Sequence, residues 1–517
     1  MKILLPICLL LFSVLLNNPR LLAQQPKVDW NANLCDDSSD IGLGYSIVDT
    51  KNHGLVVAGG ITSTDSDVVG FVGLIDVWVL RLDSLHNILW KKCYGGTGGQ
   101  IAYSIKNTKD GGYIFAGQTN SNDSEVSGNH GAQDYWVVKL DSIGNIQWAK
   151  CYGGSSTDIA YSIIQTNDGN YLVAGNSNSD DGDVKLHYGG QFTQNIWVVK
   201  LDSLGNIVWS TDIGDSTFGF SASSVMQASD GNYVITGSAG DGGYGALLVK
   251  LDMAGNIIWK HGYGGDGADG FNNIVESKDG NYVVAGSASS NDGEVSGNHG
   301  GYDFWLVKID TAGNFIWGQC YGGSNDEYAY SLCNTNDNGF ALAGETLSDD
   351  GQITNAHGSY DYWIVKTDSL GNFSWELDLG GTNADVAESI CQDESSNLYI
   401  TGYSESDNDD FNINYDNDYN LWLTKLSINT GIEPLQNGDP LDIYPNPASN
   451  QLTINSNQSL ILEIQIKDVL GQTIINKIFS NSFQKQIIDV GALPQGIYFY
   501  RVTESDSQVI TGKFVKE

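Results

Sequence analysis

Positive charge is scarce in this sequence. The 517 residues contain 25 Lys and Arg against 62 Asp and Glu, which gives a formal net charge of −37. A surface of this sign repels the phosphates of nucleic acids, so nucleic acid is excluded as a partner. The excess acid instead favours solubility and the attraction of cations or basic partners.

Cysteine is sparse as well, and no C-x-x-C pair occurs, so zinc-ribbon and dithiol redox sites lack support. Apart from Cys8 in the first residues, the cysteines are Cys35, Cys93, Cys151, Cys320, Cys333 and Cys391. Several stand at equivalent places of a repeat, and such places seldom come within bridging distance. Small buried thiols are therefore expected, although the even number leaves a disulfide framework open.

Long apolar runs are absent beyond the first residues. Residues 1–23 contain Lys2, an apolar run over residues 3–16 and a second short one before Gln24, which predicts a secretory signal peptide. No later stretch approaches the roughly 18 apolar residues that a membrane helix needs, so no transmembrane segment is expected. The mature chain is expected to be exported, and either released or attached to the cell surface.

Helical periodicity is missing too, and the 8 Pro are outnumbered by 63 Gly, as is typical of strands joined by tight turns. A phrase close to G-N-I-x-W recurs at intervals of roughly 58 residues, as at Trp90 and Trp148, with a second Trp twelve residues before each except in one short copy, where Leu247 stands. Every complete copy contains four short strand-like runs. Asp-Gly turns follow the first run, and Asp-Ser-x-Gly-Asn turns follow the third.

Seven such copies predict an all-β fold, a seven-bladed β-propeller over residues 24–430, with an open solenoid as the alternative. The seventh copy ends after its third strand, near Leu426. The missing strand is in step with the repeat at the other end of the region, where Val28, Asp29 and Trp30 stand. The N-terminal strand is therefore expected to complete the last blade and close the ring.

Strand alternation separates two faces of such a ring. The loops that follow the second and fourth strands are long and share one face, where ligand contact is expected. Tyr94, Tyr152, Tyr263 and Tyr321 end the fourth strands on that face. They are the candidates for stacking on a ligand, although their recurrence also fits a structural role. The recurring Trp residues are expected to pack between blades instead.

The long loops repeat an oxygen-rich phrase, first at residues 122–131. Asp123, Glu125 and Asp134 are the calcium candidates, but the phrase lacks the full D-x-D-x-D-G loop, and turns bonded to themselves are the favoured alternative. No other metal and no cofactor is expected. His130, His299 and His357 are expected to cap loops rather than to converge on one transition metal.

Catalytic signatures are also lacking, since there is no G-x-S-x-G, no H-E-x-x-H and no phosphate-binding loop. A pair of carboxylates that cleaves glycosides remains an alternative, because the distance between two carboxylates determines whether they can act together and the sequence does not give that distance. The turn at residues 108–113 faintly resembles the Asp box of sialidase propellers, but Gly111 directly follows Asp110 and the terminal Trp is missing. The Tyr-Gly-Gly and Trp elements resemble those of kelch blades but occur in a different order. Neither a sialidase activity nor a kelch function is therefore expected from these resemblances.

The repeat stops after Leu426, and residues 431–440 are expected to be a linker before a small Ig-like β-sandwich over residues 441–517. Four motifs there resemble the C-terminal (type A) sorting domain of the type IX secretion system. Their residues include Tyr444, Pro445, Asn446, Pro447, Gly471, Gly496, Tyr498 and Lys513. The resemblance implies a cargo protein that passes the outer membrane through the type IX machinery. It also implies removal of this domain, followed by release or attachment to an anionic lipopolysaccharide.

The expected function is therefore the non-enzymatic binding of an extracellular glycan or protein by an exported propeller. A glycoside-acting hydrolase on the same scaffold is the first alternative. A structural surface-layer protein is the second. Composition, repeats and motifs do not identify the ligand.

Overall fold

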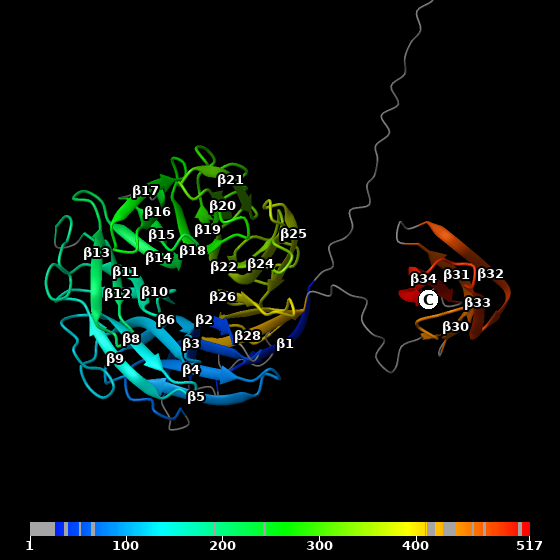
Figure 1. The fold of residues 1–517 in the computed structure, drawn as a ribbon, viewed down its shortest axis with the longest axis horizontal. Coiled ribbons are helices and arrows are strands. Elements are labelled where there is room, and N and C mark those ends of the chain that lie inside the picture. Colours follow the sequence, from blue (N-terminus) through cyan, green and yellow to red (C-terminus); the bar gives the residue numbers. More distant parts are fainter. Residues whose placement is uncertain are drawn as a thin grey trace, which may run out of the picture. The chain divides into compact units, whose positions relative to one another are not determined.

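The computed structural model of this chain contains two compact units, Met1–Ile428 and Asn429–Glu517 (Figure 1). It describes residues 26–427 and 441–517, apart from 36–39, 51–52, 64–67, 191–192, 241–244, 409, 411–418, 457–459, 469–471 and 505–508. Every regular element in these ranges is a β-strand, so the all-β prediction is confirmed. The predicted signal peptide and linker lie outside the described residues.

The first unit consists of seven four-stranded antiparallel sheets. Sheet 1 comprises β2 (Ile41–Asp49), β3 (Leu55–Thr62), β4 (Asp76–Leu82) and β5 (Ile88–Tyr94). Sheet 2 comprises β6 (Gln100–Asn107), β7 (Tyr113–Thr119), β8 (Asp134–Leu140) and β9 (Ile146–Tyr152). Sheet 3 comprises β10 (Asp158–Gln165), β11 (Tyr171–Ser177), β12 (Asn195–Leu201) and β13 (Ile207–Ile213). Sheet 4 comprises β14 (Phe220–Gln227), β15 (Tyr233–Ala239), β16 (Gly245–Leu251) and β17 (Ile257–Tyr263).

The remaining sheets of this unit follow the same order. Sheet 5 comprises β18 (Asp269–Glu276), β19 (Tyr282–Ala288), β20 (Asp303–Ile309) and β21 (Phe315–Tyr321). Sheet 6 comprises β22 (Glu327–Asn334), β23 (Phe340–Thr346), β24 (Asp361–Thr367) and β25 (Phe373–Leu379). Sheet 7 comprises β26 (Asp385–Gln392), β27 (Leu398–Ser404), β28 (Asn420–Ser427) and β1 (Lys27–Asn33).

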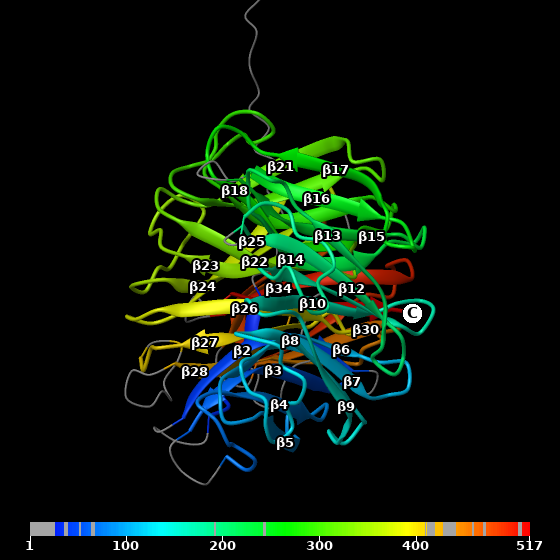
Figure 2. The ribbon, with the colours of Figure 1, turned by 90° about the vertical axis from the view of Figure 1, so that its left-hand side faces the viewer.

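The first strand of each sheet lies innermost and the fourth lies at the periphery (Figure 1). Innermost strands contact one another from each sheet to the next, and β2 of sheet 1 also contacts β26 of sheet 7. In the view turned by 90° the connecting loops of this unit gather on two opposite sides (Figure 2). One innermost strand from every sheet therefore surrounds a common centre.

Sheet 7 combines both ends of the repeat region. β1 pairs antiparallel with β28, so that Lys27 lies opposite Ser427 and Asn33 lies opposite Trp422. Val28 packs against the buried cluster that contains Trp422, and the ring of Trp30 stacks on His86 of sheet 1 at 4.6 Å. The strand that the spacing of Val28 to Trp30 predicts is thus present and paired.

The buried core lies between neighbouring sheets. Trp136 is fully buried on β8, with its ring 5.5 Å from that of Phe115. The Trp residues on the fourth strands bridge sheets, as Trp148 does by donating its indole N–H to the carbonyl of Ser203 at 3.2 Å. Burying a side chain of this size removes a large apolar area from water, which is why both recurring Trp positions serve packing.

A clamp that the sequence did not predict recurs in five sheets. A buried Lys on the third strand reaches the Asp of the Asp-Gly or Asp-Asn turn between the first and second strands. The five pairs are Lys139–Asp110, Lys200–Asp168, Lys250–Asp230, Lys308–Asp279 and Lys366–Asp337. The apolar stem of the Lys side chain packs inside the sheet while its ammonium group fixes the turn. Each clamp therefore joins the innermost hairpin to the third strand.

The second unit contains two sheets. One comprises β29 (Leu441–Tyr444), β30 (Gln451–Ser456) and β33 (Lys485–Asp489). The other comprises β31 (Ile461–Lys467), β32 (Thr473–Phe483), β34 (Gly496–Glu504) and β35 (Val509–Lys516). Ile454 of the first sheet and Ile464, Val502 and Phe514 of the second belong to one buried cluster, so the two sheets share a core.

Candidate functional site

A cavity of about 870 Å³ lies at the centre of the first unit and is lined by the innermost strands of all seven sheets. Each innermost strand contributes several residues to this lining, and one of them stands at the same place of the repeat in all seven strands. We call these equivalent residues the channel ring. They are Tyr45, Tyr103, Tyr161, Ser223, Asn272, Tyr330 and Glu388.

The channel ring has two unlike sides. Tyr45, Tyr103 and Tyr161 form a continuous aromatic arc, with consecutive ring centroids 5.2 Å apart. Opposite them stand the small polar residues Ser223 and Asn272. Asn272 donates its side-chain amide to the carbonyl of Ala329 at 2.7 Å and so ties two innermost strands together. The cavity is therefore apolar and flat-walled on one side and polar on the other.

One carboxyl group, that of Glu388, belongs to this ring, and a second, that of Glu345, lies close to it. The Tyr330 hydroxyl donates to Oε1 of Glu345 on β23 at 2.7 Å. Burial, and then the charge of Glu345, raises the pKa of Glu388 to about 8. Burial also raises the pKa of Glu345, and the hydrogen bond from Tyr330 opposes that rise only in part. At neutral pH Glu388 is thus mostly protonated and can donate a hydrogen bond.

Three partly exposed tyrosines lie near Glu345, on the face with the long loops. Tyr328 precedes Tyr330 by two residues on β22 and pairs with Glu345 on β23. The ring of Tyr328 is 5.1 Å from that of Tyr302 and 6.5 Å from that of Tyr360. Tyr302 and Tyr360 end the long loops of sheets 5 and 6. We call Tyr302, Tyr328 and Tyr360 the tyrosine cluster.

The tyrosines predicted to stack on a ligand lie elsewhere. Tyr94, Tyr152, Tyr263 and Tyr321 are all buried. Each hydroxyl donates to the carbonyl of a turn glycine in the following sheet, as from Tyr94 to Gly144 at 2.6 Å. Gly144 has φ of 76°, and a Cβ there would meet the ring of Trp90 at 3.0 Å. The burial of these four rings argues against a stacking role and gives them a structural one.

The three calcium candidates serve separate turns. Asp123 accepts the backbone N–H of Thr97 at 2.8 Å, and Glu125 accepts that of Gly95 at 3.0 Å. Asp134 accepts the backbone N–H of His130 at 3.0 Å. Within the described part of the chain these carboxylates do not form a common cluster of ligand atoms.

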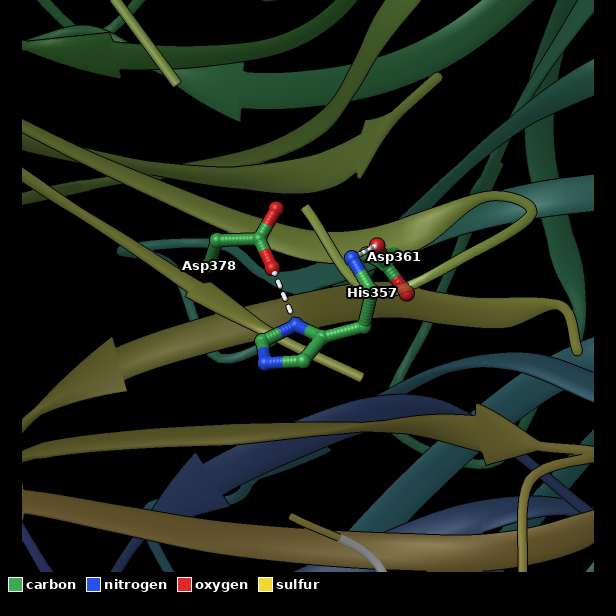
Figure 3. Close-up of side chains that lie close together, drawn as sticks. All are labelled: His357, Asp361 and Asp378. Carbon is green, nitrogen blue, oxygen red and sulfur yellow. Dashed lines mark hydrogen bonds and ion pairs between the residues drawn. The ribbon is translucent and has the colours of Figure 1, made fainter. Parts of the chain in front are cut away.

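One cluster of potential metal ligands is present among the described residues: His357, Asp361 and Asp378 (Figure 3). Nδ1 of His357 lies 2.9 Å from Oδ1 of Asp378, and the backbone N–H of His357 donates to Oδ2 of Asp361 at 2.9 Å. Burial, followed by the charges of Glu376 and Asp410, raises the pKa of Asp378 to about 8.

The other two loop histidines behave differently. Nδ1 of His130 meets Asp134 at 2.7 Å, and Nδ1 of His299 meets Asp303 at 2.6 Å. Each histidine thus binds the carboxylate four residues ahead, as the prediction of loop caps requires, whereas the ring of His357 turns to another strand. The sequence contains a signal for this different contact of His357, because Asp378 stands where sheets 2 and 5 have Cys151 and Cys320.

The sorting-motif residues stabilise the second unit. Oδ1 of Asn446 accepts the backbone N–H of Val515 at 2.9 Å, and the hydroxyl of Tyr498 donates to the carbonyl of Pro494 at 3.0 Å. Tyr444 is about half exposed, with the ammonium of Lys485 5.7 Å from its ring centroid. Pro445 and Pro447 follow Tyr444 and Asn446, Gly496 begins β34 and Lys513 is exposed on β35. Gly471 lies outside the described residues.

Residues 442–517 match the family described as "Secretion system C-terminal sorting domain". The chain therefore has the architecture of a type IX secretion cargo protein, with a β-strand repeat region that resembles propellers followed by a sorting tail. Such a tail implies export out of the cell, to the medium or to the cell surface. Among the described residues, no helix has the length and hydropathy needed to cross a bilayer.

The chain is similar to several solved structures at low identity. The WD40 β-propeller domain of Doa1 is 11% identical, with 77% of this chain and 97% of that chain covered and a TM-score of 0.43. A protein of unknown function from Dyadobacter fermentans is 12% identical, with coverages of 78% and 98% and a TM-score of 0.41. Quinohemoprotein alcohol dehydrogenase from Comamonas testosteroni is 12% identical, with coverages of 83% and 80% and a TM-score of 0.45. No curated protein matches the sequence.

Proposed function

We propose that this protein is a secreted or surface-attached β-propeller that binds an extracellular glycan, without cleaving it, on its loop-rich face beside the channel ring. The proposal has three parts, namely a closed ring of seven blades over residues 24–430, export through residues 441–517, and a binding site at the tyrosine cluster. The site is the part that gives the protein its function.

The closed ring is supported by two observations. Innermost strands contact one another in sequence from β2 to β26, and β26 contacts β2 again. The seventh sheet takes its fourth strand from the other end of the region, because β1 pairs with β28. A ring of this kind leaves no free sheet edge between blades, which is the usual advantage of propeller closure.

The observation that carries the binding proposal is the combination of aromatic and carboxyl groups beside the channel ring, where Glu345 pairs with Tyr328 and accepts a hydrogen bond from Tyr330. Partly exposed rings such as those of Tyr302, Tyr328 and Tyr360 offer flat apolar faces against which a sugar ring packs. Glu345 and Glu388 lie close by and supply hydrogen-bonding groups of the kind that sugar hydroxyls need. A few polar groups around an apolar concave surface are typical of small-ligand sites.

The test is a glycan array probed with the purified full-length protein, with and without calcium, beside a panel of extracellular matrix proteins. We expect binding to a defined set of glycans, and Tyr328→Ala should weaken it about tenfold or more, since aromatic stacking contributes on the order of 1.5 kcal/mol. Tyr188→Ala, at an exposed tyrosine of another loop, is the matched control. Binding only to basic matrix proteins, or equal loss in both variants, would contradict the proposal.

Glycoside hydrolysis is the second candidate function, because Glu345 and Glu388 interact and the pKa of each is raised. A carboxyl group that keeps its proton at neutral pH is the form required of a general acid. Release of reducing sugar from an array-positive polysaccharide, abolished in Glu388→Gln, would establish hydrolysis. Unchanged substrate after long incubation would leave binding as the function.

A further inference from the structure

We propose that His357, Asp361 and Asp378 form a binding site for a divalent transition-metal ion of the Zn²⁺ type in sheet 6. This site is separate from the proposed glycan site and does not depend on it. It arises where the His357 loop meets the first residue of β24 and the sixth residue of β25 (Figure 3).

The geometry brings together three ligand atoms of suitable chemistry. One atom from each residue lies within 4.8 Å of the other two. Ligand atoms on a tetrahedral zinc ion are separated by about 3.3 Å, given bond lengths of about 2.0–2.2 Å to nitrogen and oxygen. Small side-chain rotations are therefore enough to close the site around an ion.

Two buried oxygens of the site have no hydrogen-bond partner among the described residues. They are Oδ1 of Asp361 and Oδ2 of Asp378, and these residues are 1% and 3% exposed. A buried carboxylate oxygen without a hydrogen-bond partner destabilises the folded state, because it has lost its hydrogen bonds to water and has none within the protein. The burial of Asp378 in particular calls for a ligand, since its other oxygen already contacts His357.

The other histidine loops provide an internal comparison. In sheets 2 and 5 the residue paired with the third-strand Trp is Cys151 or Cys320, and His130 or His299 binds Asp134 or Asp303. In sheet 6 that residue is Asp378, paired with Trp363, and His357 turns its ring towards it. Sheet 3 also has an Asp at this place, Asp212, but His187 there contacts Asn195. Among these sheets, the imidazole therefore meets the carboxylate in sheet 6.

The charge around the site also favours a cation. Glu376, Asp385 and Asp410 are all close enough to Asp378 to interact with it electrostatically, so acidic groups surround the site. Oδ2 of Asp410 lies 3.8 Å from Nε2 of His357. The side chains of His357 and Asp410 are 23% and 39% exposed, so an ion can reach the cluster from solvent on this side.

The ligand set selects the class of metal. One imidazole nitrogen with two carboxylates suits Zn²⁺ or a neighbouring transition ion better than Ca²⁺, which prefers six to eight oxygens. The cysteines at the position equivalent to Asp378, such as Cys151 and Cys320, belong to other sheets. A site of nitrogen and oxygen ligands with no sulfur is the expected coordination.

The experiment uses the full-length protein without a histidine tag, stripped with chelator and titrated with ZnCl₂ by calorimetry. We expect one Zn²⁺ per chain, and an affinity weakened about tenfold or more in His357→Gln and in Asp378→Asn. His299→Gln is the matched control, because it removes the same side chain from a loop of the same repeat, and it should bind as the parent does. Thermal unfolding of each variant without metal shows that the fold is intact.

X-ray absorption at the zinc edge of the parent protein gives a second readout that needs no variant. Nitrogen and oxygen ligands at about 2.0–2.2 Å with one imidazole are expected. The absence of Zn²⁺ binding in the parent, binding that persists in both site variants, or equal weakening in His299→Gln would overturn the proposal. Sulfur ligands at about 2.3 Å would do the same.

Discussion

The hydroxyl of Tyr330 donates a hydrogen bond of 2.7 Å to Oε1 of Glu345, and this bond connects the channel ring to the second strand of sheet 6. Glu345 is 8% exposed, so the bond satisfies a carboxyl group that water scarcely reaches. The bond therefore holds the aromatic wall and the carboxyl group of the proposed site in one arrangement.

Replacing Tyr330 by Phe removes this donor and little else. We expect the free energy of unfolding to fall by about 1–3 kcal/mol, because a buried carboxyl group loses its partner. Urea titration of the parent and of Tyr330→Phe measures the difference. Tyr188→Phe, at an exposed hydroxyl, should leave stability unchanged, and a loss as large as that of Tyr330→Phe would contradict the assigned role.

Glu388 should make the protein less stable as the pH rises. Burial and the charge of Glu345 raise its pKa from 4.5 to about 8, so between these values the folded state binds a proton that the unfolded state has released. The contribution of Glu388 to stability is therefore largest below about pH 4.5 and decreases by roughly 2–4 kcal/mol up to pH 8. Glu388→Gln should flatten this part of the profile.

Unfolding by urea at pH 5 and pH 8 measures the effect of Glu388. Glu394→Gln is the control, since Glu394 is exposed on a turn. A Glu388→Gln profile that keeps the full slope of the parent would show that the proton is bound elsewhere.

The clamp between Lys139 and Asp110 should make the protein sensitive to acid. Partial burial alone would raise the pKa of Asp110, but hydrogen bonds from Lys139, Thr108 and Gly112 outweigh it and lower the pKa to about 2. The stabilisation is therefore present above about pH 4 and is lost as the pH falls towards 2.

Asp110→Ala leaves the buried ammonium of Lys139 without its carboxylate and should cost about 1–3 kcal/mol at pH 7. The Lys139→Met, Asp110→Ala double variant should recover part of that loss, because no buried charge remains unpaired. Asp180→Ala, at an exposed loop position, is the control. Additive losses in the double variant would disprove the coupling.

Removal of β1 should destabilise the whole first unit. Deleting residues 26–33 uncovers β28 and exposes the surface that Val28 and Trp30 bury, at a cost of about 3–6 kcal/mol. Thermal unfolding and size-exclusion chromatography should show a lower midpoint and association through the free edge. A synthetic peptide of residues 26–35 should restore the midpoint, whereas a peptide of scrambled sequence should not.

Deletion of residues 441–517 should stop export. The sorting tail is the part recognised by the type IX machinery, so the truncated chain is expected to remain in the periplasm, as cell fractionation would show. Fusion of residues 431–517 to a periplasmic reporter is the converse test and should bring the reporter out of the cell. Normal surface display of the truncated chain would refute the assignment.

The strands and turns were predictable because they repeat. Asp-Gly and Asp-Ser-x-Gly-Asn turns recur at fixed distances from each Trp, so local turn chemistry and spacing predict the strands of each sheet. The spacing from Trp30 to Trp90 even identified the strand that pairs with β28. The repeated residues of this sequence therefore predict its strands and turns.

The candidate sites were not predictable in the same way. Tyr302 and Tyr360 stand at the same place in the repeat, directly before Asp303 and Asp361, but Tyr328 does not recur, and the three rings meet only because separate segments converge. Tyr94 stands at the end of a strand, which suggested exposure, yet its ring points into the next sheet and its hydroxyl finds Gly144. Asp378 lies 21 residues after His357, and only the departure from Cys at its position signals a new contact.

The pairing of Lys27 with Ser427 places the beginning and the end of the repeat region side by side in one sheet. A short linker between those two residues would make the region a continuous circle, and new ends could then be opened at any tight turn, such as that at Gly111. A circularly permuted chain of this kind should keep all seven sheets. The place at which the circle is cut is thus not a requirement of the fold, and in this chain it puts Ser427, which precedes the sorting tail in sequence, beside β1.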